Sequence, residues 1–179
     1  MYENFFKVLS AFEKNNLADP LQETLHFFDI ILNKSISKAD IYEYLKDNDA
    51  IASFTEKRSQ GHPQEYLLGL GSFFGNMFFC DPGALIPRDE TELLVNTALA
   101  YIKKVEGPET VNVVDMGTGC GSIAISIALN DTRTRVVASD LNESTIRVAR
   151  KNVDKFNLED RVELLTGDLY APFEGLGLE

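Results

Sequence analysis

The sequence predicts an α/β fold that follows a small helical part. Apolar, β-branched segments at 111–114 and 135–139 alternate with helix-like segments. This alternation is typical of a parallel sheet whose strands are joined by right-handed crossovers. Three alternate glycines, Gly117, Gly119 and Gly121, separate the first of these strands from the helix that follows it. The N-terminal part of the chain instead shows apolar residues at helical spacing.

Composition places the chain among globular proteins. It has 179 residues, 44% hydrophobic and 25% charged, which is enough for one full domain or two small ones. A net charge of −11 without a dense basic stripe makes binding to nucleic acid phosphates a poor prospect. We see no signal peptide at the N-terminus and no apolar run of membrane-spanning length, so we expect a cytoplasmic protein.

The two cysteines and two histidines do not suggest a metal site or a disulfide framework. Cys120 stands among glycines, and we interpret it as a small spacer residue rather than a nucleophile. Cys80, the other cysteine, has no partner at a recognisable spacing. His26 and His62 are far apart in the sequence and lack neighbouring ligands at metal-binding spacing.

Residues 1–70 are predicted to form short helices around an aromatic core. The first contains Phe5, Phe6, Leu9 and Phe12 at helical spacing. The second begins at Asp19-Pro20-Leu21-Gln22, which resembles an N-cap, a first-turn proline and a capping-box glutamine. We expect it to bury the apolar residues of one face, which are Leu25, Phe28, Ile31 and Leu32.

Three further helices are predicted in this part. One begins at Ser37, with Asp40 in its first turn and an apolar face formed by Ile41, Tyr44 and Leu45. Another runs from about 48 to 59 and is closed by Gly61. A short last helix opens at Pro63 and ends at Gly69.

A β-hairpin is predicted next, followed by the α/β domain. Apolar runs within 72–79 flank Gly75-Asn76, which indicates a tight turn. We therefore divide the chain into a helical domain at 1–70, a hairpin connector at 71–80 and an α/β domain at 81–179.

The α/β domain is expected to begin with an amphipathic helix at 89–104. Its apolar side would contain Leu93, Leu94, Thr97, Ala98 and Tyr101. The first strand and its helix follow, and after the second strand Asn142 is expected to cap a helix with Ile146, Val148 and Ala149 as its apolar residues. A third strand ends near Asp168.

Acidic residues close the first two strands and suit a nucleoside-bearing cofactor. Asp140 ends the second strand, where a carboxylate can accept hydrogen bonds from both ribose hydroxyls. The glycine spacing differs from that of a dinucleotide fingerprint, and Asp115 would repel a pyrophosphate. A carboxylate at that position suits the ammonium group of a methionine moiety, directly or through water. A dehydrogenase is accordingly the weakest of the functions considered.

The pattern Asp115-x-Gly-x-Gly-x-Gly resembles motif I of Rossmann-like methyltransferases that use S-adenosylmethionine. That resemblance implies a cofactor site at the strand ends, with Asp168 near the adenine amino group and Leu141 against the adenine. Core packing would explain Leu141 equally well, and a strand-end turn would explain Asp168 almost as well. The implied cofactor-binding residues are Asp115, Gly117, Thr118, Gly119, Gly121, Asp140, Leu141 and Asp168.

A second tract resembles one methyltransferase family in particular. Arg58-x-x-Gly61-x-Pro63-x-x-Tyr66-x-x-Gly69, then Phe73-x-Gly75 and Leu85-Ile-Pro-Arg-Asp-Glu-Thr-Glu92, are similar to HemK-type N(5)-glutamine methyltransferases. Asp89 stands where that family usually has a second proline, and Arg58 could equally pair with a nearby acid. The resemblance implies that residues at the start of this domain line the cofactor mouth, namely Pro87, Arg88, Glu90, Thr91 and Glu92.

The family resemblance also implies a substrate and partner. Such enzymes methylate the glutamine amide of the Gly-Gly-Gln loop in peptide chain release factors, and their N-terminal helical domain helps to engage the release factor. Family members hold the glutamine with Asn-Pro-Pro-Tyr, which this sequence does not contain. We therefore interpret the chain as a fragment with no useful turnover by itself, and we expect the open edge of its three-stranded sheet to promote self-association.

Two other functions stay open on the sequence alone. One is a non-catalytic module that docks a protein partner. The other is an amino methyltransferase acting on adenine N6 in nucleic acids, a class that also uses Asn-Pro-Pro-Tyr. The acidic charge and the match over 58–92 argue against the latter.

Overall fold

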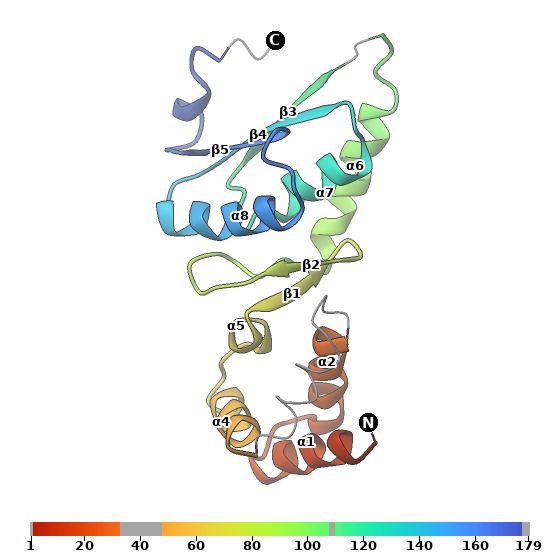
Figure 1. Cartoon of the computed structure of the whole chain (residues 1–179), viewed down its shortest axis with the longest axis vertical. Coiled ribbons are helices and arrows are strands. Elements are labelled where there is room, and N and C mark those ends of the chain that lie inside the picture. The colour runs from red at the N-terminus through yellow and green to blue at the C-terminus, as the bar shows by residue number, and fades with distance from the viewer. Residues whose placement is uncertain (1, 33–47, 108–109, 177–179) are drawn as a thin grey trace. The chain divides into compact units, whose positions relative to one another are not determined.

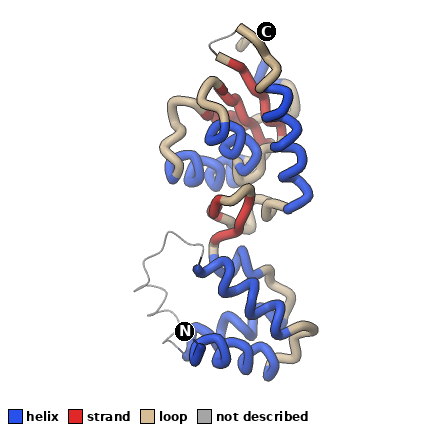
Figure 2. Tube along the Cα trace, turned by 90° about the vertical axis from the view of Figure 1, so that its right-hand side faces the viewer, coloured by secondary structure: helices blue, strands red, loops and turns tan. Residues whose placement is uncertain are grey.

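The computed structural model describes residues 2–32, 48–107 and 110–176 of the chain. They fall into two compact units, Met1–Leu70 and Gly71–Glu179. Figure 2 shows helices throughout the first unit and the parallel strands in the second. The expected α/β class, with a small helical bundle, a hairpin and an incomplete parallel sheet, is confirmed.

The first unit is a small helical bundle with an aromatic core. Phe12, Phe27 and Phe54 are buried together, with ring centroids 5.0 Å apart for Phe27–Phe54 and 6.0 Å apart for Phe12–Phe54. The helix expected to begin at Ser37 lies outside the described residues. The described helices are α1 (Tyr2–Lys14), α2 (Pro20–Leu32), α4 (Asn48–Ser59) and α5 (Gln64–Leu68).

Helix α2 begins as the sequence predicts, and two of the four residues expected in the core, Phe28 and Ile31, are buried. Asp19 Oδ1 accepts the backbone N–H of Gln22 at 3.1 Å, which is the expected cap. Leu25 and Leu32, which we expected to be buried, are exposed. The buried residues are Thr24, Phe27, Phe28, Ile30 and Ile31. Because α2 is apolar around most of its circumference, spacing alone does not select the face that packs on α1.

The end of the first unit follows the predicted turns. Gly61 has φ of 93°, and Gly69 caps α5 with φ of 68°, so both adopt the left-handed backbone that favours glycine. Pro63 precedes α5 as its N-cap residue. These residues of the tract that resembles the HemK-type family therefore have a clear structural role in shaping the chain around α5.

The hairpin forms, but its turn lies one residue earlier than predicted. Strands β1 (Leu70–Phe73) and β2 (Asn76–Phe79) flank Phe74 and Gly75, whose φ values are 49° and 71°. Two left-handed residues match the twist of a two-residue hairpin. Glu92 Oε1 accepts the backbone N–H of Phe74 at 2.7 Å, and this contact holds the bulky residue in the turn.

The sheet of the second unit is parallel, in the order β3-β4-β5. The connecting helices α7 (Ser122–Asn130) and α8 (Glu143–Lys155) lie on one face of it (Figure 1). Paired rows such as Val113, Val136 and Val162 point into the core beneath these helices. The strands are β3 (Val111–Met116), β4 (Thr134–Asp140) and β5 (Val162–Thr166).

The other face of this sheet is exposed along β3 among the described residues. Val114 and Met116 on β3 are 43% and 41% exposed. In the described sheet β3 pairs only with β4, so its outer edge is also open. Self-association through this edge stays a prediction. None of the helices that the structure describes is long and apolar enough to cross a bilayer.

Helix α6 (Glu92–Ile102) packs by a different face from the one predicted. Leu93, Leu94 and Tyr101 are exposed, whereas Val95, Leu99 and Ile102 are buried. The predicted helix at 89–104 begins with a short 3-10 turn at Asp89–Thr91 before α6. Apolar residues on both sides of α6 leave its spacing ambiguous, and packing on α7 decides the buried face.

Asn152 joins three parts of the second unit that are remote in sequence. This fully buried side chain on α8 accepts the Phe79 N–H at 2.7 Å and donates to the Phe79 carbonyl at 3.1 Å. It also donates to the Cys120 carbonyl in the glycine loop at 2.9 Å. The amide thereby satisfies backbone groups of β2 and of the loop that no strand pairing reaches.

We expect Asn152→Ala to lower the free energy of unfolding of the second unit by about 3 kcal/mol, because buried backbone groups lose their partners. Urea unfolding followed by circular dichroism measures this change. Asn96→Ala is the matched control, since Asn96 is exposed on α6 and bonds only within its helix in the contacts described. Equal stability of the two variants would contradict the bridging role of Asn152.

Candidate functional site

The glycine loop between β3 and α7 folds back onto the end of β4. Gly117, Gly119 and Gly121 all have left-handed backbone, with φ of 74°, 59° and 84°. The N–H groups of Gly117 and Thr118 both donate to the Ser139 carbonyl at 2.8 Å. Two hydrogen bonds to one carbonyl fix the start of the loop against the second strand.

The three glycines have two different roles. A Cβ at Gly121 would lie 3.1 Å from Ile125 Cδ1 and 3.4 Å from Ala149 Cβ, so this glycine lets α7 and α8 pack closely. A Cβ at Gly117 or Gly119 would meet nothing within 4 Å. The backbone at 117 and 119 therefore faces open space, which a ligand could approach closely.

Asp115 is a buried carboxylate at the end of β3. Its side chain is mostly enclosed, and Thr118 Oγ1 donates to Asp115 Oδ2 at 2.7 Å. Burial raises the pKa of Asp115, while hydrogen bonds from Thr118 and the Ala124 backbone oppose the rise and the nearby Asp140 adds to it. The described structure thus holds a carboxylate against the first turn of α7 without a cation beside it.

Asp140 ends β4 as predicted and is half-buried. Its Oδ2 accepts the Gly119 N–H at 3.1 Å, and its Oδ1 accepts the Asn142 N–H at 3.2 Å. Each carboxylate oxygen can accept a second bond, so capacity for two donors is left. Asn142 occupies the N-cap position of α8, but it makes no side-chain cap hydrogen bond, contrary to expectation. Its backbone is engaged by Asp140 instead.

Asp168 follows the neighbouring strand and is more exposed. The Gly167 N–H donates to the Asp140 carbonyl at 3.0 Å, which places the end of β5 beside the end of β4. Leu141, Leu169 and Tyr170 are exposed at these same strand ends, with 63%, 67% and 70% of each residue accessible. The three predicted acidic residues thus lie at or just after the carboxyl ends of three adjacent strands.

The five residues expected to line a cofactor mouth differ in their exposure and contacts. Arg88 and Glu90 are exposed, and Pro87 and Thr91 are half-buried. Glu92 binds the turn of the hairpin, as described above. Lining of a cofactor mouth by these five residues stays a prediction.

The segment before that tract contacts the glycine loop directly, which the sequence analysis missed. Ala84 packs with Cys120 and Val148 in one buried cluster. Thr145 Oγ1 on α8 donates to the Gly83 carbonyl at 2.5 Å. Burial raises the pKa of the Cys120 thiol, so it is a packing residue with little thiolate at neutral pH.

The chain is similar in sequence to curated methyltransferases. Residues 90–176 match the family model described as methyltransferase small domain. Over 124 residues the chain is 39% identical to a release factor glutamine methyltransferase of Moorella thermoacetica, covering 69% of this chain and 43% of that protein. The release factor glutamine methyltransferase of Bordetella pertussis is 42% identical, over 64% of this chain and 40% of that protein.

A third relative extends the match to nearly the whole chain. The release factor glutamine methyltransferase of Fusobacterium nucleatum is 30% identical over 175 residues, which is 95% of this chain and 48% of that protein. The chain is thus similar in sequence to release factor glutamine methyltransferases over up to 95% of its own length. It spans a little under half the length of these relatives.

Among solved structures, one similar chain is an S-adenosylmethionine-dependent methyltransferase, SibL. It is 25% identical, with a TM-score of 0.39 and coverage of 46% of this chain and 23% of that one.

We expect Asp115→Asn to stabilise the protein at neutral pH by about 1 kcal/mol. Burial raises the folded pKa of Asp115 above its unfolded value, so the folded state binds the proton more tightly. Stability due to this group is therefore greatest below the unfolded pKa and falls as pH rises through the folded pKa. Asparagine lacks the charge and still has an oxygen and an NH2 group for Thr118.

Urea unfolding at several pH values tests this expectation, with the exposed Asp160→Asn as control. The advantage of Asp115→Asn should shrink toward acidic pH, where the wild-type carboxyl is protonated in both states. A variant less stable than wild type at neutral pH would contradict it.

Proposed function

We propose that this chain forms the cofactor-binding part of an S-adenosylmethionine-dependent enzyme that methylates release factors on glutamine. One observation carries the proposal. The open backbone of Gly117 and Gly119 lies between the buried carboxylate of Asp115 and the strand-end carboxylate of Asp140. This arrangement provides a close approach for a ligand and acceptors on both sides of it.

The residues present fit the cofactor from its methionine end to its adenine end. Asp115 would accept the ammonium group, directly or through water, and the backbone of Gly117, Thr118 and Gly119 would pass beside the methionine moiety. Asp140 would accept the ribose hydroxyls with the capacity that its two backbone partners leave free. Gly121 contributes by letting α7 approach α8, which sets the position of the loop.

The adenine would lie over the ends of β4 and β5. Leu141 is exposed there and offers an apolar surface for the base, and Asp168 offers an acceptor for the adenine amino group. When bound, S-adenosylmethionine would supply a methyl group on a sulfonium; a nucleophile would take it by direct displacement, which breaks the sulfur–methyl bond and leaves S-adenosylhomocysteine. The chain's contribution is therefore to hold the donor in one orientation.

The protein substrate is inferred from the family. The relatives are named release factor glutamine methyltransferases, and we propose the glutamine amide of a release factor as the methyl acceptor. The helical unit would help to engage the release factor. The Asn-Pro-Pro-Tyr sequence that clamps the glutamine in the family is absent from these residues, so we propose cofactor binding without turnover for the 179-residue chain.

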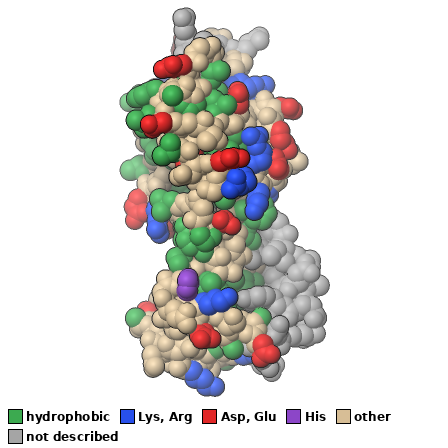
Figure 3. All heavy atoms as spheres, turned by 90° about the vertical axis from the view of Figure 1, so that its left-hand side faces the viewer, with side chains coloured by type: hydrophobic (Ala, Val, Ile, Leu, Met, Phe, Trp, Pro, Cys, Tyr) green, Lys and Arg blue, Asp and Glu red, His purple; other side chains and the backbone are tan. Residues whose placement is uncertain are grey.

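Nucleic acid is a weaker substrate proposal than a protein. On the face in Figure 3, acidic and basic side chains of the second unit are interspersed and form no continuous basic stripe. The net charge of −11 likewise opposes contact with phosphates.

We expect the chain to bind S-adenosylhomocysteine and Asp140→Asn to weaken that binding by about tenfold to a hundredfold, because a charged acceptor is lost. Isothermal titration calorimetry measures both affinities. Asp160→Asn is the matched control, since this exposed carboxylate precedes β5 at the opposite end of the strands. Absence of binding by a folded wild-type chain would overturn the proposed cofactor site.

Methylation itself gives a separate prediction. With a release factor and radiolabelled S-adenosylmethionine, the 179-residue chain should transfer no methyl group, whereas the Moorella thermoacetica relative serves as a positive control for the assay. The expected reason is a missing acceptor clamp, because displacement depends on alignment. Turnover by the chain alone would contradict the need for Asn-Pro-Pro-Tyr.

A further inference from the structure

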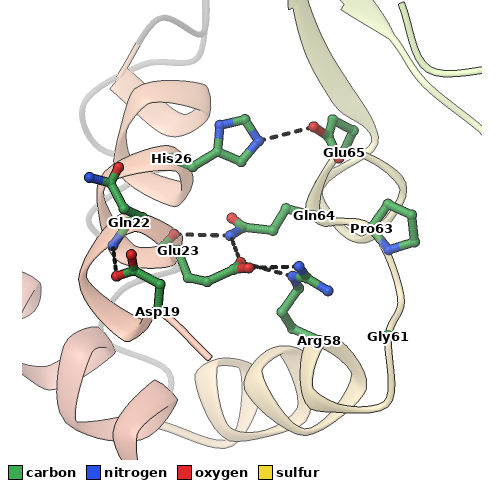
Figure 4. A pocket seen from close by; sticks show the side chains of 9 residues that line it. All are labelled: Asp19, Gln22, Glu23, His26, Arg58, Gly61, Pro63, Gln64 and Glu65. Atoms are coloured by element: carbon green, nitrogen blue, oxygen red, sulfur yellow. Dashed lines mark hydrogen bonds and ion pairs between the residues drawn. The ribbon is translucent and has the colours of Figure 1, made fainter. Parts of the chain in front are cut away.

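A polar pocket in the helical unit is not explained by cofactor binding. Its volume is about 440 Å³, and its walls come from the start of α2, the end of α4 and α5 (Figure 4). Its charged lining residues are Asp19, Glu23, His26, Arg58 and Glu65.

The Glu23 carboxylate in the pocket wall is paired with neighbouring donors. Arg58 donates to both carboxylate oxygens, from Nε at 2.8 Å and from Nη2 at 2.6 Å, and Gln64 Nε2 donates to the same carboxylate. Burial alone would raise the pKa of Glu23, but the hydrogen bonds from Arg58 and Gln64 outweigh it and lower the pKa. Arg58, the first residue of the tract that resembles the HemK-type family, is thereby committed to Glu23.

Gln64 presents an unpartnered oxygen to the pocket. Its Nε2 also donates to the Glu23 carbonyl at 2.9 Å. Because both partners on that side are acceptors, the nitrogen must face Glu23 and Oε1 must face away from it. The residue is only 2% exposed, and Oε1 has no hydrogen-bond partner among the residues that the structure describes. An unsatisfied buried acceptor of this kind destabilises the free chain, and a donor from a ligand would remove that cost.

Carboxylate acceptors outnumber cations around the pocket. Asp19 uses Oδ1 for the Gln22 N–H, which leaves its other oxygen. Glu65 Oε1 binds His26 Nε2 at 3.0 Å, on the side to which Gln64 Oε1 points in Figure 4. The His26 side chain is 45% exposed, so a ligand can reach this pair from solvent, and a donor would reach Gln64 Oε1 by displacing it.

This chemistry selects a cation with several N–H donors. The Asp19 carboxylate has no cationic partner in the contacts described and would repel a phosphate or a carboxylate, whereas both cations of the lining, Arg58 and His26, are already paired with Glu23 and Glu65. A guanidinium is planar, always charged and has five N–H donors, so it can reach a carboxylate and an amide oxygen together. An ammonium would reach fewer of these acceptors from one position.

We propose that this pocket receives an arginine side chain of the release factor. The identity of the partner rests on the proposed function, whereas the preference for a guanidinium rests on the acceptors described here. The helical unit would thus contribute a defined charged contact to substrate docking.

Binding of an arginine probe tests the pocket directly. N-acetyl-arginine methyl ester is titrated into the full chain, and the side-chain NH2 signals of Gln64 are followed by NMR. We expect saturable shifts of these signals, weaker binding of the corresponding lysine ester, and at least a fivefold loss of affinity in the double variant Asp19→Asn, Glu65→Gln. Asparagine still caps α2, and glutamine keeps an acceptor for His26.

Glu13→Gln is the control for charge, because Glu13 is exposed on α1 outside the pocket. Unchanged Gln64 signals, equal binding of the lysine probe, or equal affinity of the double variant would each overturn the arginine site.

A second measurement separates this proposal from the proposed function. Binding of intact release factor to the full chain is compared for wild type, the double variant and Glu13→Gln. Weaker binding by the double variant alone supports an arginine contact, and equal binding by all three overturns it while leaving the proposed substrate in place. Arginine-probe binding with no release factor bound would overturn the release factor as partner.

Discussion

The carbonyl oxygen of Ser139 is the point on which the candidate cofactor site depends. Its hydrogen bonds from Gly117 and Thr118 attach the glycine loop of one strand to the end of the next. Gly119 can then donate to Asp140, one residue beyond Ser139, and Thr118 can donate back to Asp115. One carbonyl thereby sets the spacing between the two carboxylates that face the open backbone. Parallel strands are needed for this, because only they bring successive carboxyl ends to one edge of a sheet.

Local sequence signals predicted the parts of the fold that depend on neighbouring residues. Gly117 and Gly61 mark left-handed backbone, and Asp19 caps a helix three residues before the N–H that it accepts. Such features depend on steric limits and short-range hydrogen bonds. The buried face of α6 was predicted wrongly because both of its sides are apolar, so the choice belongs to the packing partner rather than to the helix.

Long-range contacts of polar residues escaped prediction for a different reason. Asn152 is 73 residues from Phe79 and 32 from Cys120, and no local pattern marks a buried asparagine that bridges them. The bond from Phe74 to Glu92 similarly assigns a hairpin contact to a residue expected at a cofactor mouth. For Asp115 and Asp140, the sequence supplied positions at strand ends, but only the fold shows which oxygens retain capacity for further donors.

The two proposed binding sites share a physical feature, which is a polar group held at a cost in the free chain. Asp115 is buried beside Asp140 with a raised pKa, and Gln64 keeps a buried oxygen that accepts no hydrogen bond from the described part of the chain. A sequence optimised only for stability would have neither the buried carboxylate nor the unsatisfied amide oxygen. Proteins tend to retain such groups where function requires them. A cationic ligand would stabilise both groups, because its charge favours the Asp115 carboxylate and its N–H groups can donate to the Gln64 oxygen. The unsatisfied acceptors destabilise the unbound chain, and satisfying them on binding strengthens the affinity for ligands with several donors. These buried acceptors therefore serve recognition rather than stability.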